Sequence, residues 1–429
     1  MRQSITLSFL ALTFVCAFAT PAMADPIPWE GSGAGDFNGQ RTRADDELGI
    51  TFWWLQDVHM QQNVQGGISK GGAAFSRSML ALNYQFEPLT PLKGTEFQVS
   101  AAWNVGTQIN DFVGALLSPT TIWRSNAIRL YELYLGQSFA DGQVNFIIGR
   151  IGVSDMTAGT TPLLFDFMSP GYDANPGAFY LNQPVAAYLY PVATWGARIK
   201  FVPKKQDFEI YFGAYNGTRG LDAADKRGVD FTLNLKQSVY LMGEFAYKLN
   251  QDPEDPGLPG NYKIGALYDS FAFTRLDDST QTESGNPGWY LVVDQMLFRE
   301  RPPAAPTDSA KSKSGERKTF PPDQGLYGFA NFVMHPKKSI NISPYWVSAG
   351  LVYKGLIPHR DADHIDFGFY YASLSPESLL SFEFQFEFIY RFQLTPWFMI
   401  GPDLQYFKNP GGGQVKDAVV VGIDMHFAL

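Results

Sequence analysis

The chain of 429 residues has a single cysteine and few charged side chains, and both scarcities exclude classes of protein. Cys16 lies in an apolar N-terminal stretch, so the rest of the chain has no thiol for a disulfide or a thiolate metal site. Beyond that stretch there is no run of about 18 apolar residues, which excludes a helical membrane protein. Charged residues make up 17% of the chain, the net charge is -9, and basic clusters are absent, so we predict no nucleic-acid partner.

Histidine is also scarce, and its placement argues against metal chemistry. The five histidines are scattered, and only His359 and His364 are near one another, without the strand or helix spacing that metal ligands need. No serine is recognisably paired with a histidine as a hydrolase nucleophile would be. The glycine-rich stretches 31–35 and 411–413 lack the strand–helix context of a phosphate site. We therefore predict no enzyme, no cofactor and no metal.

Aromatic residues are abundant, and their spacing is the main signal. They make up 15% of the chain, 35 of them phenylalanine, yet the mean hydropathy is only -0.14. In the stretch 381–392 every even position from Phe382 to Phe392 is aromatic, while the odd positions read Ser, Glu, Gln, Glu, Ile and Arg. A strand with these two faces suits a closed barrel in lipid, with aromatics toward the membrane and carboxylates toward a wet lumen.

Similar alternating segments recur from residue 50 to the C-terminus, separated by clusters of Gly, Pro, Asn and Asp. We count seventeen, near 50–60, 78–87, 96–105, 127–136, 143–152, 194–202, 207–216, 229–236, 239–248, 262–272, 289–298, 326–335, 344–354, 364–373, 381–393, 397–407 and 418–429. Bacterial single-chain barrels have an even number of strands, so one assignment is wrong or one strand is missed. The weakest assignments are 262–272 and the region between Pro336 and Leu394. We predict an all-β, antiparallel up-and-down transmembrane barrel of about 16 strands (16–18).

The N-terminus carries an export signal. Arg2 supplies positive charge, residues 5–19 are apolar, and Ala22-Met23-Ala24 is an A-x-A cleavage site. We therefore predict a signal peptide over 1–24, an N-terminal periplasmic segment over 25–49, and the barrel over 50–429.

The predicted connections differ in length. The segments 203–206 and 394–396 are expected to be periplasmic turns. The long connections are expected at 61–77, 106–126, 153–193 and 299–325. We predict that 153–193, far longer than an ordinary loop, folds into the lumen and narrows it; an extracellular excursion is the alternative.

The polar register of the strands predicts the chemistry of the lumen. Sugars are bound through hydrogen bonds to their hydroxyls and through contact of ring faces with aromatic side chains. The candidate pore-lining residues are Arg129, Glu132, Arg150, Asp155, Tyr172, Arg198, Lys200, Glu209 and Tyr211. At each position the alternative is a solvated wall residue that contacts no substrate. Arg129 and Arg150 fall in apolar registers, so we expect either bulges that turn them inward or positions at the rim.

Short motifs along the chain resemble a known family. They are GDFNGQRTR at 35–43, RLYELY at 129–134, GR at 149–150, DQMLFRE at 294–300, DQGL at 323–326, AGLVYKGLIPHR at 349–360, LTPW at 394–397, PDLQY at 402–406, NPGG at 409–412 and DA at 417–418. In order and spacing they resemble the carbohydrate-selective outer-membrane porins of the OprB type. Phe37 and Asn38 stand where that family has Trp and Gly, and His359 stands where it has Gly.

The resemblance implies a 16-stranded barrel, narrowed by inward loops, that passes sugars passively through the bacterial outer membrane. Expected partners are mono- or small oligosaccharides as permeating solutes, lipid and lipopolysaccharide around the barrel, and a possible homotrimer. Two alternatives stay open: a general or organic-anion diffusion porin, and an outer-membrane enzyme. A purely structural barrel with a plugged lumen is a third.

Overall fold

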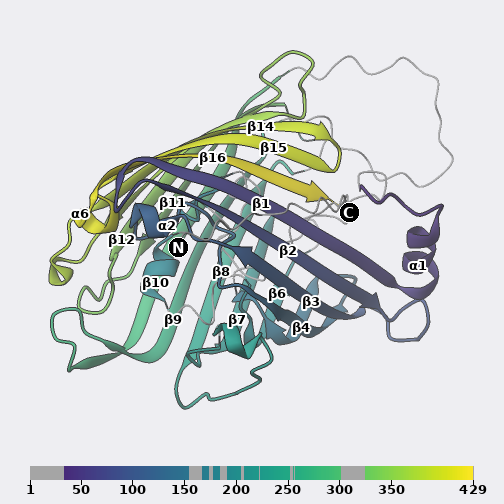
Figure 1. Ribbon diagram of the computed structural model, residues 1–429. Helices are drawn as coiled ribbons and strands as arrows, with labels where there is room; N and C mark the ends of the chain where they lie inside the picture. Colours follow the sequence, from purple (N-terminus) through teal and green to yellow (C-terminus); the bar gives the residue numbers. More distant parts are fainter. Residues whose placement is uncertain are drawn as a thin grey trace, which may run out of the picture.

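The described part of the chain folds as a closed, antiparallel β-barrel (Figure 1). The computed structural model describes residues 33–153, 167–172, 177–183, 191–203, 207–221, 223–251, 255, 257–300 and 324–428. The strands are β1 (Ile50–Gly67), β2 (Gly71–Gln85), β3 (Thr95–Gly106), β4 (Ala127–Phe139), β5 (Val144–Ile151), β6 (Thr194–Phe201), β7 (Phe208–Asn216), β8 (Val239–Leu249), β9 (Gly260–Thr274), β10 (Thr282–Arg299), β11 (Gly325–Met334), β12 (Tyr345–Lys354), β13 (His364–Ser373), β14 (Glu383–Thr395), β15 (Phe398–Lys408) and β16 (Lys416–Ala428). Each strand pairs with its sequence neighbours, and β1 pairs with β16 to close the barrel.

The described helices are short and lie outside the sheet. They are α1 (Gln40–Leu48), α2 (Asn110–Val113), α4 (Ala178–Asn182) and α6 (Pro410–Gly413), with 3-10 turns η3 (Ala224–Lys226) and η4 (Pro376–Ser378). None of the helices in the described ranges is long and apolar enough to cross a bilayer. The predicted signal peptide, 1–24, lies outside the described residues, and the predicted periplasmic segment is described from residue 33, with α1 leading into β1.

The sixteen strands of the described chain resolve the parity problem posed by the sequence. The assignments that looked weak are correct, because 262–272 lies in β9 and the region 336–394 contains β12, β13 and β14. The wrong assignment is 229–236, which alternates like a strand but belongs to the connection between β7 and β8. The predicted long connection 61–77 is also wrong, because β1 and β2 stay paired as far as Asn63 and Gly71.

The two faces of the strands are as the alternation predicts. In β14, Glu383, Gln385 and Glu387 are buried on the inner face, whereas Phe388 and Phe392 are exposed on the outer face. The ladders pair the strand backbones with one another, which is the condition for a backbone to lie in hydrocarbon. The chain is thus built to present apolar side chains to lipid and polar ones to the lumen.

The two ends of the barrel carry different connections. Antiparallel alternation places the connections between β6 and β7 and between β14 and β15 at the end where β1 begins and β16 ends. Residues 204–206 of the first lie outside the described residues. In Figure 1 the start of β1, the end of β16 and α1 lie at the same end of the barrel. Three long connections, 107–126, 152–193 and 217–238, lie at the opposite end, which is the extracellular pattern of outer-membrane barrels. The predicted long connection 299–325 joins β10 to β11 at the end where β1 begins, and its residues 301–323 lie outside the described residues.

A bulge in β4 explains how Arg129 and Glu132 both reach the interior. β4 has one more residue than β3 between the pairs Val99–Leu133 and Ala101–Leu130. The extra residue reverses the alternation, so that Arg129 on one side of the bulge and Glu132 on the other are both buried. The predicted conflict at Arg129 is therefore resolved by a bulge.

Candidate functional site

The connection between β5 and β6 crosses the lumen and binds the far wall. The backbone N–H groups of Met168 and Ser169 donate to Glu387 of β14, at 2.6 and 3.1 Å. The Tyr172 hydroxyl donates to Gln385 on the same strand. A buried carboxylate that accepts two backbone N–H bonds is a strong anchor. The described part of this connection is therefore folded inward, as predicted.

Aromatic rings pack behind this anchor. Phe167 and Tyr172 of the connection contact each other at 4.5 Å between ring centroids, and both contact Phe329 of β11. Tyr172 also meets Tyr370 of β13, which stacks on Trp346 of β12 at 4.4 Å and 25°. Buried apolar side chains therefore fill this part of the lumen along β10–β14, and the same cluster continues to Tyr215 of β7 and to Tyr240 and Met242 of β8.

The helix α4 is bound to the same wall through a neutral histidine. His335, which follows β11, has Nδ1 3.0 Å from Asn182 Nδ2 and Nε2 3.0 Å from the Gln183 amide. The backbone N–H and C=O of Ser343 fix the Asn182 amide, so its NH2 must donate to Nδ1. Nε2 then carries the proton, and the Gln183 oxygen should face it. Burial lowers the pKa of His335 to about 3, so the ring stays neutral at ordinary pH.

The connection between β3 and β4 also folds inward. Leu116 N–H donates to Glu383 at 2.8 Å, and Pro119 C=O accepts from Gln61 and Gln405, each at 2.9 Å. The two inward connections meet where Thr121 N–H donates to Met168 C=O at 2.7 Å. Together they narrow the lumen from the extracellular end.

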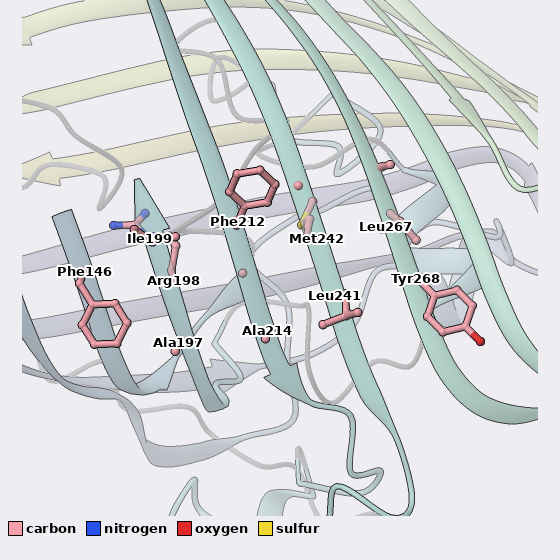
Figure 2. Close-up of a pocket in the computed structure, with 13 residues that line it drawn as sticks. Phe146, Ala197, Arg198, Ile199, Phe212, Ala214, Leu241, Met242, Leu267 and Tyr268 are labelled. Atoms are coloured by element: carbon pink, nitrogen blue, oxygen red, sulfur yellow. The ribbon is translucent and has the colours of Figure 1, made fainter. Parts of the chain in front are cut away.

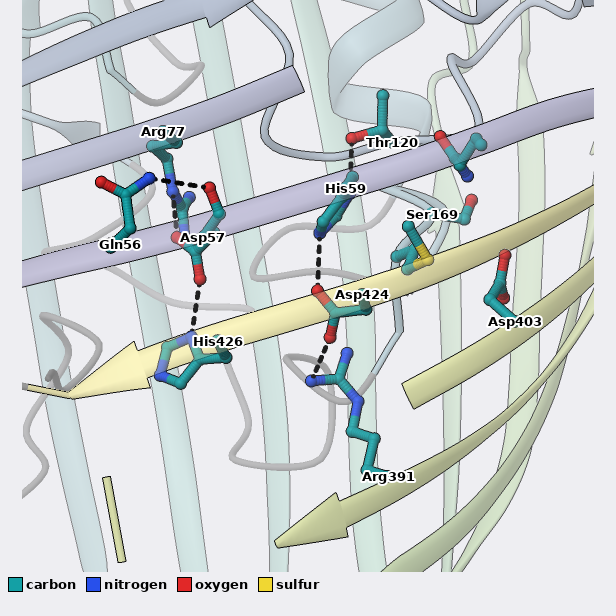
Figure 3. A network of polar contacts seen from close by, with 12 residues as sticks. Gln56, Asp57, His59, Arg77, Thr120, Ser169, Arg391, Asp403, Asp424 and His426 are labelled. Atoms are coloured by element: carbon teal, nitrogen blue, oxygen red, sulfur yellow. Dashed lines mark hydrogen bonds and ion pairs between the residues drawn. The ribbon is translucent and has the colours of Figure 1, made fainter. Parts of the chain in front are cut away.

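A network of ion pairs reinforces the closing strands β1 and β16 (Figure 3). Asp57 lies between Arg77, at 2.6 Å, and His426, at 2.6 Å. Two residues further along β1, His59 Nε2 is 3.0 Å from one carboxylate oxygen of Asp424, and the other oxygen of Asp424 is 2.9 Å from Arg391.

The other nitrogen of His59 ties this network to an inward connection. His59 Nδ1 is 2.8 Å from the Thr120 hydroxyl. If Nε2–H donates to Asp424, Nδ1 accepts the hydroxyl proton, so every polar group of this chain of contacts is satisfied. No group of three or more potential metal ligands occurs within the described ranges.

The opposite wall, β6–β8, carries a compact cluster of charges. Glu209 accepts from Lys248 at 2.8 Å, from the Tyr211 hydroxyl at 2.6 Å, and pairs with Lys200 at 3.2 Å. Lys200 Nζ and the Arg198 guanidinium lie 5.2 and 6.0 Å from the Tyr211 ring centroid, within cation–π range. We define Arg198, Lys200, Glu209, Tyr211 and Lys248 as the charged cluster.

Four of the predicted pore-lining residues are therefore brought together, namely Arg198, Lys200, Glu209 and Tyr211. They are buried, and Lys248, which sequence reasoning missed, is half-buried, with 34% of its side chain accessible. Lys248 shares its strand face with Glu244, so its lumen register could have been read from the alternation of β8.

The remaining predicted residues lie elsewhere. Arg129 donates to the Ser125 carbonyl at 2.9 Å, and Glu132 accepts from Gly152 N–H at 3.2 Å, so both lie at the bases of the inward connections. Tyr172 is part of the inward connection itself. Asp155 lies outside the described residues.

The side chain of Arg150 lies on the outer face of the barrel wall and not on the lumen face. It shares its strand face with Ile148, which is exposed on the outside of the barrel. Its guanidinium donates to Asp230 C=O at 2.9 Å and lies 5.9 Å from the Phe231 ring. The apolar register predicted for Arg150 is thus real, and the connection between β7 and β8 covers the charge.

The carboxylates that hold the inward connections, Glu383 and Glu387, were visible in the sequence only as lumen-facing positions. Glu383 accepts from Leu116 N–H, from Gly411 N–H at 2.7 Å and from the Tyr370 hydroxyl at 2.8 Å. Its partners are far away in the chain, so no local pattern could identify them.

A hollow of about 620 Å³ lies on the outer face of β5–β9 (Figure 2). It is bordered by Phe146, Phe212, Leu241 and Tyr268, with small residues such as Ala214 at its base. Phe212, Leu241 and Tyr268 are exposed outward, so the hollow faces the membrane side of the wall. It is separate from the lumen and is not the route of a polar solute.

Comparison with known proteins agrees with this architecture. The sequence profile of a family described as "Carbohydrate-selective porin, OprB family" matches residues 69–429. The chain is 26% identical over 442 residues to Porin B of Pseudomonas aeruginosa, covering 91% of this chain and 89% of that protein. Its fold is similar to the high-pH structure of Pseudomonas putida OprB, with a TM-score of 0.79 and 22% identity over 92% of this chain and 97% of that chain.

The profile covers most of the chain, and the closed barrel with its apolar outer face agrees with it. The expected outer-membrane location and carbohydrate transport are confirmed. This protein belongs to the OprB family of carbohydrate-selective porins of the bacterial outer membrane.

Proposed function

We propose that sugars cross the lumen along the wall of β6–β8, past the charged cluster, because the inward connections occupy the opposite wall. The observation that carries this proposal is the anchoring of Met168 and Ser169 on Glu387. That contact holds the described part of the connection on β14, and we take the charged side of the barrel as the route. The permeating solutes are mono- or small oligosaccharides.

The chemistry of the cluster suits neutral polyols. Glu209 offers acceptors, Lys200 and Lys248 offer donors, and Tyr211 adds an aromatic ring that a sugar face can contact. Both charge signs stand within one hydrogen-bonded group, so the cluster presents no strong field of one sign to select an ion. Conduction requires contacts that are favourable enough for entry and weak enough for release.

A general or organic-anion porin is the alternative that needs a test. Liposome swelling with a series of neutral sugars of increasing size should give rates that fall with size. Reversal potentials with organic anions should show only weak anion preference. Equal permeation of organic anions and neutral sugars of the same size would contradict the proposed selectivity for sugars.

We also propose partners other than the permeating sugar. The exposed apolar outer face suits lipid and the acyl chains of lipopolysaccharide. The function we propose contains no catalytic step. A homotrimer stays a prediction, and native mass measurement of the detergent-extracted protein would check it.

A further inference from the structure

The barrel wall has a notch at its extracellular end above β5. The last pair between β4 and β5 is Leu133–Arg150, yet β4 begins six positions earlier along the chain, at Ala127. The outer face there is still apolar, since Ile128 of β4 and Trp103 of β3 are exposed. Within the described ranges, the β5-side edge of β4 from Ala127 to Glu132 therefore pairs with no strand, at a level where its neighbours face lipid.

The connection between β7 and β8 fills this notch. Leu130 N–H of β4 donates to Arg227 C=O at 3.0 Å. Gly228 lies so close to the Leu130 carbonyl that a Cβ would collide with it, and its φ of +70° is a second reason for glycine. The chain then runs on as the segment 229–236, which we call the wall segment.

Three side chains bind three successive carbonyls of the wall segment. Arg150 of β5 donates to Asp230 C=O at 2.9 Å, and Trp195 of β6 donates to Phe231 C=O at 2.9 Å. Asn216 of β7 donates to Thr232 C=O at 3.1 Å, and its oxygen accepts from Asn234 N–H at 3.2 Å.

The N–H of Thr232 donates to its neighbour Asp230, at 3.0 Å. Hydrogen bonds from side chains thus replace the ladder of a strand. Backbone at membrane depth requires such satisfaction, because no water is present to supply it.

The odd positions of the wall segment form an apolar row. Val229, Phe231, Leu233 and Leu235 are 59%, 45%, 59% and 55% exposed, much as Ile264 (60%) and Phe212 (55%) are on the outer face of the sheet. The Phe231 ring lies 6.0 Å from that of Trp195, whose strand borders the outer hollow of Figure 2. The row is therefore continuous with the membrane-facing surface.

We propose that the wall segment is a part of the membrane-facing wall in which acyl chains of the surrounding lipid contact Val229, Phe231, Leu233 and Leu235. Arg150, Trp195 and Asn216 act as its positioning residues. The proposal accounts for the strand-like alternation of a segment that pairs with no strand. It also accounts for an arginine in the outward register of β5.

Single-cysteine reporters test the contact with lipid. Leu233→Cys is compared with Ile264→Cys, on the outer face of β9, and with Leu379→Cys, which is 94% exposed in the connection between β13 and β14. Each is labelled with a fluorophore after folding, and the purified porin is placed in phosphatidylcholine vesicles. Quenching by nitroxide-labelled acyl chains and by aqueous iodide is then measured.

We expect L233C to match I264C, with strong quenching by the lipid nitroxide and little by iodide, and to differ from L379C. Quenching of L233C by iodide as strong as that of L379C would overturn the proposal, because the segment would then lie in water. Protection from both quenchers, with cross-linking of L233C into dimers, would also overturn it, because a second copy would be the occupant.

The positioning role has its own readout. Arg150→Gln in the L233C background should shift quenching from the lipid nitroxide toward iodide, and Arg150→Lys, which retains a cationic donor, should restore part of it. Heat-modifiable migration on gels verifies that each barrel is folded. Unchanged quenching in a folded R150Q barrel would remove Arg150 from the account.

Discussion

The inner faces of β10–β14 and of β6–β8 carry different kinds of side chain. Along β10–β14 the inner face is aromatic, with Trp346, Tyr370 and Phe329 packed against the inward connection. Along β6–β8 it carries the charged cluster, in which Lys200 and Lys248 both pair with Glu209, beside Tyr215, Tyr240 and Met242 of the apolar cluster. The first wall resembles the core of a soluble protein, and the second resembles a binding surface.

The difference is the basis of the proposed route, in which an internal loop is held on one side of the lumen and sugars pass along the other. Aromatic packing and buried carboxylates fix the connection to one side, where Glu387 and Glu383 accept its N–H groups. The charged cluster lies on β6–β8, away from the described part of the connection that is bound to β14. Under the proposed function, narrowing and conduction depend on different strands.

Deleting the inward connection between β5 and β6 should have the largest effect on the difference between the two walls. Deletion of residues 159–188 takes away the groups that contact Glu387, so the lumen should widen and single-channel conductance in planar bilayers should rise. Glu387→Ala should raise it less, since it removes hydrogen bonds to a charged group, each about 1.5–3 kcal/mol. The control Glu87→Ala, an exposed residue near Lys93, should change nothing. Wild-type conductance in the deletion would place the connection outside the conduction path.

The charged wall can be tested through its central carboxylate. Glu209→Ala removes the partner of both Lys200 and Lys248, and breaking a buried pair in this way costs about 3–5 kcal/mol. Lys200→Met should cost less, because Glu209 keeps Lys248 and Tyr211. Urea unfolding in lipid vesicles measures both, and E209A should also shift the reversal potential toward anions. Equal destabilisation by the two variants would show that Glu209 is not the centre of the cluster.

The assignment of inner and outer faces underlies both predictions. Phe388→Arg would place a charge on the lipid face of β14, at a cost of about 2–4 kcal/mol near mid-membrane. Asn83→Arg is the matched change on the lumen face of β2, where Glu96 lies 3.1 Å from the amide. We expect F388R to lower the free energy of unfolding and N83R to leave it nearly unchanged. The opposite order would invert the register of the barrel.

The anchor of α4 predicts a smaller, pH-dependent effect. His335 has a pKa of about 3 in the folded protein, below the ordinary value of 6.5, because it is buried. The unfolded chain therefore takes up the proton first as pH falls. Above pH 6.5 the ring is neutral in both the folded and the unfolded protein, so its burial costs no stability. As pH falls from 6.5 to 3 the free energy of unfolding decreases, because only the unfolded chain takes up the proton.

Between pH 7 and pH 5 the loss from His335 should be about 2 kcal/mol. Urea unfolding of wild type and His335→Gln at the two pH values isolates this term by difference. The variant should show a weaker dependence on pH than the wild type. An identical dependence in both proteins would mean that His335 does not titrate as the buried site requires.

The sequence predicted the barrel well because period-two alternation is a local signal. Phe388 and Glu387 are neighbours, and their opposite faces follow from strand geometry alone. The same rule assigned a strand to 229–236, where the alternation is real but Arg150, Trp195 and Asn216 replace the neighbouring strand. Pairing depends on which chain lies alongside, and a local pattern does not contain that information.

The site was predicted in part for the same reason. Arg198, Lys200, Glu209 and Tyr211 lie on two adjacent strands joined by a short turn, so their proximity follows from the hairpin. The partners of Glu387 and His335 come from 152–193, more than 150 positions away, and only the folded chain brings them together. A bulge was one of the two solutions expected for Arg129 and Arg150, and the structure has a bulge in β4 beside Arg129.

The most direct test of the central claim is thiol labelling of the two walls. Lys248→Cys, in the charged cluster, and Val333→Cys, buried in the aromatic core with Phe179, are treated with a bulky water-soluble maleimide before sugar-driven liposome swelling. We predict that K248C reacts and its swelling rate falls, whereas V333C reacts slowly and swells as before. Full labelling of K248C with unchanged swelling, or rapid labelling of V333C that stops sugar entry, would contradict the account.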